Sequence, residues 1–189
     1  MKRLNKKGFT LVELLAVIVI LALIMAIAIY SISGILQSSR ENVFKETALN
    51  VINGIKMQLT ASNELREGTY YFSEKLLENN NDLPFGGKID YGYDKGAAID
   101  ASRGTVSRAT APVNISTCVA SNGVFDSNLK SFVNVGYNGS QYTFEICLIP
   151  TKMNGSTSYS GTQKYIRGSE TELLGNSIAT IKDIIARTS

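Results

Sequence analysis

The chain has 189 residues and a formal net charge of +3, with 19 basic and 16 acidic side chains and no histidine or tryptophan. Four of the basic residues lie within the first seven positions, so the remainder is close to neutral and lacks the basic face that nucleic-acid binding requires. Without histidine, the commonest general base and zinc ligand is missing, and no spacing of carboxylates indicates catalysis.

The first element predicted along the chain is an apolar helix that follows a basic cluster. Lysines and arginines at positions 2–7 lead into a long apolar run in which Glu13 is the one charge before Arg40. A run of this length is long enough to cross a bilayer as a helix. The positive flank places the N-terminus in the cytoplasm and the rest of the chain outside.

Three interpretations of residues 1–30 compete. The segment is a secretory signal cleaved near Ala26-Ile27-Ala28, an uncleaved signal anchor, or a helix that survives processing between Gly8 and Phe9. A carboxylate in lipid costs about 2.5–3.5 kcal/mol and is usually paired. The third interpretation gives Glu13 a partner, the freed α-amino group of Phe9 in a neighbouring chain. The alternative is that Glu13 lies near the membrane interface and extends into water there.

The segment K-K-G-F-T-L-V-E-L-L resembles the class III signal of type IV pilins and pseudopilins. The matching positions are the basic leader, Gly8, Phe9, Thr10, Leu11, Val12, Glu13 and Leu14. The resemblance implies that a prepilin peptidase removes residues 1–8 by cutting between Gly8 and Phe9, and methylates the new amino group of Phe9. It also implies that Glu13 sets the register of subunits in a helical fibre.

The resemblance further implies a structural subunit of a pilus or pseudopilus fibre that serves adhesion, motility, DNA uptake or secretion, without enzymatic activity or a cofactor. Its partners would be other copies of itself, related pilins, an assembly platform and an extension ATPase. The chain would be a single-pass protein of the cytoplasmic membrane before assembly, and part of an extracellular or cell-surface fibre afterwards. The alternative from another class is a monomeric, membrane-anchored extracellular binding domain, which would need a pocket within residues 69–112.

One departure from the family concerns the apolar run. Many members have a proline about two-thirds of the way along it, whereas the prolines here are at positions 84, 112 and 150. The weakest helical point of the run is instead Gly34, which follows Ser31 and Ser33.

The helical pattern continues after the membrane segment, but charged residues return. Apolar residues at helical spacing between Phe44 and Leu59 form one stripe, which predicts a single helix over residues 9–66. We expect residues 9–37 to form the membrane and fibre-core half, and residues 38–68 the amphipathic half. A striped helix needs one covering partner, here residues 69–189. The expected fold class is therefore α+β, with the long helix packed on a small antiparallel sheet and a helix at the C-terminus.

Patterns after the long helix are weaker. The predictions are a short helix from Ser73 to Asn79 capped by Ser73, a short strand from Lys88 to Tyr93, an exposed loop over 96–112, and a strand-like segment from Val113 to Val119. We expect Tyr91 and Tyr93 to be partly buried by packing and not to form a ligand site.

A hairpin is predicted around Asn138-Gly139, the strongest short-range turn signal in the chain. With these two residues in a type I′ turn, Val135 faces Tyr142 and Val133 faces Phe144. The apolar face of the hairpin should lie on the helix stripe, and it comprises Val133, Val135, Tyr137, Phe144, Ile146 and Leu148.

The two cysteines, Cys118 and Cys147, are compatible with one disulfide in an exported domain or with two separately buried thiols. Cys147 points away from the apolar face of the hairpin. A bond to Cys118 would close a loop of about 30 residues, worth about 3–4 kcal/mol in the chain-entropy model.

The C-terminal region should contain a short edge strand at Tyr165-Ile166 and then a helix. Ser169 precedes the helix, Glu170 and Glu172 fall in its first turn, and the helical spacing is given by Leu174, Ile178, Ile181 and Ile185. We expect this helix to pack on the globular domain. No phosphate-binding loop, dinucleotide fingerprint, calcium loop or nucleophile elbow occurs in the chain.

Overall fold

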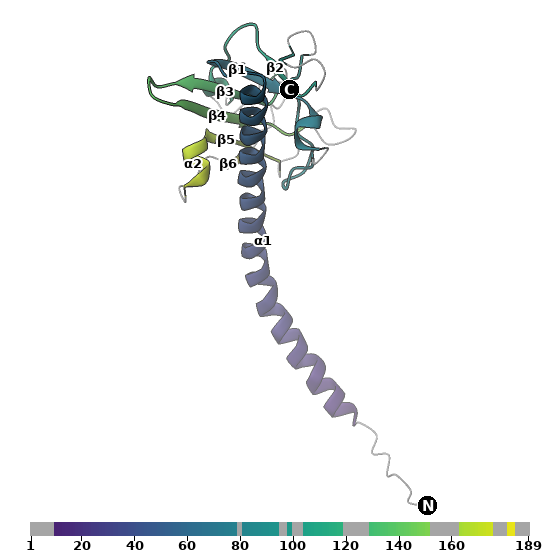
Figure 1. Cartoon of the computed structure of the whole chain (residues 1–189). Helices are drawn as coiled ribbons and strands as arrows, with labels where there is room; N and C mark the ends of the chain where they lie inside the picture. The colour runs from purple at the N-terminus through teal and green to yellow at the C-terminus, as the bar shows by residue number, and fades with distance from the viewer. Residues whose placement is uncertain are drawn as a thin grey trace, which may run out of the picture. The chain divides into compact units, whose positions relative to one another are not determined.

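A computed structural model describes residues 10–78, 81–94, 98–99, 104–118, 129–151, 163–175 and 181–183 of the chain. It separates into two compact units, residues 1–39 and 40–189, which are described one at a time. The first contains the apolar half of the long helix, and the second contains the other half of that helix with the sheet (Figure 1).

The long helix, α1, spans Leu11–Ala61 and is the one described helix long and apolar enough to cross a membrane. Gly34 lies within it. The predicted end at residue 66 is wrong, because the chain leaves the helix through Asn63 in a left-handed conformation with φ of 54°. The amide of Glu64 donates to the carbonyl of Leu59, and that of Asn63 donates to Thr60. These two bonds form a Schellman cap, which accepts asparagine at the left-handed position.

The second unit contains a six-stranded sheet in the order β2-β1-β3-β4-β5-β6, in which all neighbouring strands are antiparallel. The strands are β1 (Gly68–Phe72), β2 (Val106–Arg108), β3 (Phe132–Tyr137), β4 (Tyr142–Leu148), β5 (Lys164–Ser169) and β6 (Ile181–Asp183). The β3–β4 hairpin occupies the centre of this sheet.

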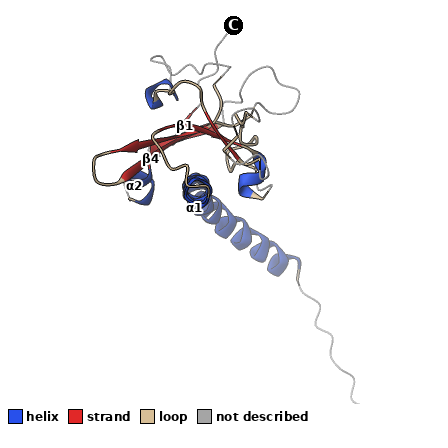
Figure 2. Cartoon of the chain, turned by 45° about the horizontal axis from the view of Figure 1, so that its top comes forward, coloured by secondary structure: helices blue, strands red, loops and turns tan. Residues whose placement is uncertain are grey.

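The second half of α1 packs on one face of the sheet, which confirms the predicted α+β fold (Figure 2). All six predicted stripe residues are fully buried in one apolar cluster with the sheet, and they are Phe44, Ala48, Val51, Ile52, Ile55 and Leu59. Lys56, beside the stripe, pairs with Glu170 and lies 4.6 Å from the ring centroid of Phe144. The ammonium group thus joins α1 to β4 and to the short helix α2 (Glu170–Leu174).

The predicted hairpin exists, and five of the six residues of its predicted apolar face are buried, but Tyr137 at the tip is exposed. The register of the hairpin is shifted by two residues. Val135 lies opposite Phe144, and Tyr137 lies opposite Tyr142. The turn is wider than type I′ because the Asn138 carboxamide oxygen accepts from the amides of Ser140 and Gln141, at 3.0 and 2.9 Å. A two-residue shift leaves every side chain on its predicted face, since successive strand residues alternate between faces.

Several predictions between β1 and β3 are wrong. The short helix is a 3-10 turn, η1 (Glu74–Leu77), and the Ser73 hydroxyl donates to the carbonyl of Gly104 instead of capping it. The predicted strand over 88–93 forms only isolated bridges, and the predicted strand-like segment contains a 3-10 turn, η3 (Ile115–Cys118). Part of the predicted loop over 96–112 is strand β2, because pairing with β1 supplies backbone hydrogen bonds that apolar content does not reveal.

The C-terminal helix begins where predicted but is much shorter. Ser169 caps α2, which ends at Leu174. Ile181 belongs to β6, which pairs with β5, so the helical spacing through Ile181 is not realised as a helix. The strand containing Tyr165 is therefore interior, not at the edge of the sheet. Ile178 and Ile185 lie outside the described residues.

The opposite face of the sheet contains a second, smaller apolar cluster of Cys118, Phe132, Cys147, Ile149 and Tyr165, all buried. Cys118 of η3 and Cys147 of β4 form a disulfide in the structure, with their Cα atoms 5.9 Å apart. The bond fastens the segment between β2 and β3 to the centre of the sheet.

Candidate assembly segment

The candidate site is the N-terminal end of α1, which contains the predicted processing and registration residues. Gly8 and Phe9 lie outside the described residues. The structure begins at Thr10, and Glu13 is in the first turn of α1.

Thr10 and Glu13 form a reciprocal capping box. One carboxylate oxygen of Glu13 accepts from the backbone amide of Thr10 at 2.8 Å and from its hydroxyl at 2.9 Å, and the amide of Glu13 donates to that hydroxyl at 3.3 Å. These bonds satisfy amides that the first turn of a helix leaves unpaired. This role of Thr10 was not predicted, although the T-x-x-E spacing is a sequence signal for it. In the single chain, Glu13 thus has an intramolecular partner, and no neighbouring subunit is needed to satisfy it.

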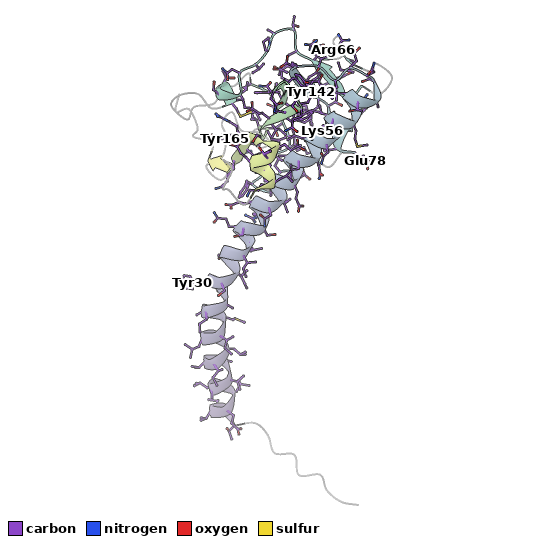
Figure 3. The ribbon with its side chains drawn as sticks, turned by 60° about the vertical axis from the view of Figure 1, so that its left-hand side comes forward. Tyr30, Lys56, Arg66, Glu78, Tyr142 and Tyr165 are labelled. Carbon is purple, nitrogen blue, oxygen red and sulfur yellow. A yellow bond between two sulfur atoms is a disulfide. The ribbon has the colours of Figure 1, made fainter. Side chains whose placement is uncertain are left out.

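The apolar half of α1 exposes its side chains on every side. All the large apolar residues from Leu11 to Leu36 are exposed, and Figure 3 shows the side chains of this half directed outward, with Tyr30 labelled. A helix that is apolar all round is stable only inside lipid or among other helices. The hydroxyl of Ser33 donates to the carbonyl of Ile29 at 3.0 Å, so this polar group is satisfied within the helix.

Residues 3–29 match the model of the prokaryotic N-terminal methylation motif. The chain carries a class III prepilin signal, which is typical of type IV pilins and pseudopilins. No curated protein and no solved structure matches the chain. The signal and the α+β fold make the protein type IV pilin-like. The signal implies processing by a prepilin peptidase, and with the apolar helix it indicates membrane insertion followed by assembly at the surface.

Tyr91 and Tyr93 lie in the segment that the alternative binding-domain hypothesis needs, and both are partly buried, as expected. The hydroxyl of Tyr91 donates a hydrogen bond to the side chain of Asn81. Its ring packs edge-on against the ring of Phe72, with the ring centroids 5.6 Å apart. Burial raises the pKa of Tyr91 to about 12, since the phenolate is poorly solvated there. The hydroxyl of Tyr93 is buried without a hydrogen-bond partner among the described residues.

An open groove of about 590 Å³ lies between the second half of α1 and η1. Its walls include Asn50, Asn53 and Met57 of α1, with Lys75 and Glu78 at η1. Among the described residues, no three His, Cys, Asp or Glu side chains are grouped so that they could hold a metal ion.

Proposed function

We propose that the protein is a non-enzymatic structural subunit of a type IV pilus or pseudopilus fibre. Prepilin peptidase would remove residues 1–8 and methylate Phe9. Residues 9–37 would then form the fibre core, residues 38–68 would connect the core to the globular part, and residues 69–189 would coat the fibre. An assembly platform and an extension ATPase would move each copy from the cytoplasmic membrane into an extracellular or cell-surface fibre.

The observation that carries this proposal is the methylation motif at the start of a 51-residue helix whose apolar half is exposed on all sides. A cleaved secretory signal would discard that helix, and a plain anchor would need neither the motif nor Glu13. Assembly uses both, because the apolar half-helices of many copies cover one another once they leave the lipid.

The N-terminus of the mature protein tests the processing step. Mass spectrometry should find N-methylated Phe9 as the first residue of fibre or membrane material. An N-terminus at Ile29, as a signal cleaved after Ala28 would leave, or an intact Met1, contradicts the proposal and leaves the membrane-anchored binding domain as the better account.

The role of Glu13 is tested separately. After cleavage, the carboxylate of Glu13 would exchange its bonds with Thr10 for an ion pair with the Phe9 amine of a neighbouring copy. Glu13→Ala should leave membrane insertion intact and strongly reduce incorporation into fibres. Glu46→Ala, an exposed glutamate in the second half of the same helix, is the matched control and should assemble normally. A normal fibre yield from Glu13→Ala would eliminate the registration role.

A further inference from the structure

The tip of the β3–β4 hairpin presents an exposed aromatic pair. Tyr137 and Tyr142 lie opposite each other, with ring centroids 5.1 Å apart and 48% and 37% of their surfaces exposed. The pair is held firmly at its base, because the Tyr142 hydroxyl donates to the carbonyl of Leu65 and the Tyr137 amide donates to the carboxylate of Glu67. The tip itself, residues 137–142, contains no charge. Rigid, uncharged and aromatic, it has the composition of an interface centre.

A second uncharged surface lies on α1, along the wall of the groove beside η1. Between Thr47 and Ala61 the one charged residue is Lys56, and it pairs with Glu170 on the far side of this wall. The solvent-facing residues are therefore neutral, and Met57 among them is 74% exposed. A solvated helix face normally carries charges, whereas a face depleted of Lys and Glu and containing an exposed Met is typical of a protein interface.

The tip and the groove are on opposite flanks of the globular unit. In Figure 1 the β3–β4 turn extends to the left of α1, whereas the teal segment with η1 lies to its right. One chain therefore cannot fill its own groove with its own tip. When two different surfaces of one protein bind each other between copies, the contact repeats head to tail, and a rotation that does not close gives an open filament.

The geometry points to a head-to-tail contact in which the hairpin tip at residues 137–142 of one copy docks in the α1–η1 groove of the next. The tip and the α1 wall match in their lack of charge, and the η1 wall adds one basic and one acidic residue, Lys75 and Glu78. The groove therefore has no excess of either charge that would favour nucleic acid, anionic lipid headgroups or a charged peptide as the occupant. This inference rests on the proposed fibre and names a lateral contact between its globular units. The α1 core would hold the copies along the axis, and this contact would fix the rotation between neighbours.

Site-directed cross-linking tests the contact in assembled fibres. Cells would produce two versions of the chain together, one with Ser140→Cys at the tip and one with Asn53→Cys in the groove. A short bismaleimide should join them into a dimer in sheared fibres. Ser140→Cys with Asn42→Cys is the matched control, because Asn42 is an exposed asparagine of α1 outside the groove, and this pair should give at least tenfold less dimer. Fibres that form without the Ser140–Asn53 dimer, or that give equal dimer with the control, overturn the inference and leave the proposed function standing.

Charge substitution gives a second measurement if a cysteine variant fails to assemble. Met57→Glu places a charge in the groove at a largely exposed position, so the single chain should still fold. Fibre yield should fall at least tenfold, and Gln141→Lys at the tip should restore most of it. An undiminished yield from Met57→Glu, or no recovery in the double variant, overturns the contact. An absence of fibres from the unmodified chain would instead contradict the proposed function.

Discussion

At the scale of single residues, the same device begins both of the described α-helices. A hydroxyl residue is followed three positions later by glutamate, as Thr10 and Glu13 in α1 and as Ser169 and Glu172 in α2. In α2 the box only ends a strand and starts a helix. In α1 the glutamate is also the residue proposed to bind a neighbouring copy, so in that proposal Thr10 would hold the carboxylate until the amine of the neighbouring copy replaced it.

Replacing Thr10 should loosen the first turn of α1. Thr10→Ala removes the hydroxyl that both donates to Glu13 and accepts from its amide, so the first helical amides should exchange hydrogen about fivefold faster. Hydrogen exchange followed by NMR in detergent micelles measures this. Thr10→Ser keeps the hydroxyl and should exchange as the unmodified chain does. Equal exchange in the alanine and serine variants would mean that the capping box does not stabilise the helix.

Glu172 should make the stability of the globular unit depend on acidity. The backbone amide of Ser169, and then its hydroxyl, hold the pKa of the Glu172 carboxyl below its usual value. The carboxylate therefore contributes stability above the unfolded-state pKa of about 4.3, and this contribution is lost as the pH falls through the lower folded-state pKa. Glu172→Gln keeps an acceptor for the cap but does not titrate.

Unfolding by urea at several pH values checks this. The stability difference between the unmodified chain and Glu172→Gln should be largest near neutral pH and vanish below about pH 3. It should stay below about 1 kcal/mol, since the carboxylate is exposed and solvent screens it. Parallel pH profiles for the two proteins would contradict the prediction.

At the scale of elements, the patterns that the sequence analysis interpreted correctly are those that repeat. The stripe of α1 recurs over several turns, and the alternation of β3 and β4 recurs over several residues, so both predicted the buried face. The register of the hairpin depends instead on one side chain, Asn138, which widens the turn by accepting two amides. Asn63, likewise, ends α1 through a single left-handed residue.

The short strands were not predictable from local pattern. β2 has three residues, and its neighbour β1 begins at Gly68, so neither shows an alternation long enough to stand out. Both exist because their backbones pair with strands distant in the sequence. β6 shows the opposite error, since the spacing of Ile181 fits a helix but the edge of β5 offers it backbone partners. In the assembly segment, family resemblance named Glu13, whereas the capping role of Thr10 was not predicted although the T-x-x-E spacing indicates it.

The stripe of α1 should account for much of the stability of the globular unit. Ile52 is fully buried against the sheet, so Ile52→Ala should lower the free energy of unfolding by about 2–5 kcal/mol through lost burial and a cavity. Met57 lies five positions further along the same helix and is 74% exposed. Met57→Ala should therefore change the free energy of unfolding by less than about 0.5 kcal/mol. Chemical denaturation of the detergent-solubilised protein compares the two. Similar losses would mean that the helix does not dock on the sheet as described.

At the scale of the whole molecule, the globular unit has two apolar clusters separated by the sheet. The larger is covered by α1, and the smaller is covered by the segment that contains η3. No long helix among the described residues covers the smaller cluster. The Cys118–Cys147 disulfide instead links the segment that contains η3 to β4 of the sheet. Folding of this face should therefore depend on oxidation after export, unlike the face under α1.

The contribution of the disulfide to stability can be tested by reduction, without any substitution. Reduction of the unmodified protein should lower its free energy of unfolding by about 3 kcal/mol, because the bond closes a loop with a sequence separation of 29 residues in the unfolded chain. Both sulfur atoms belong to residues that are fully buried, so dithiothreitol should act slowly on the folded protein and quickly in urea. The double variant Cys118→Ala and Cys147→Ala should have the same lowered free energy of unfolding as the reduced protein, and the reductant should not change it. Non-reducing peptide mapping that finds two free thiols in exported protein, or equal stability with and without reductant, would show that the smaller cluster holds without the bond.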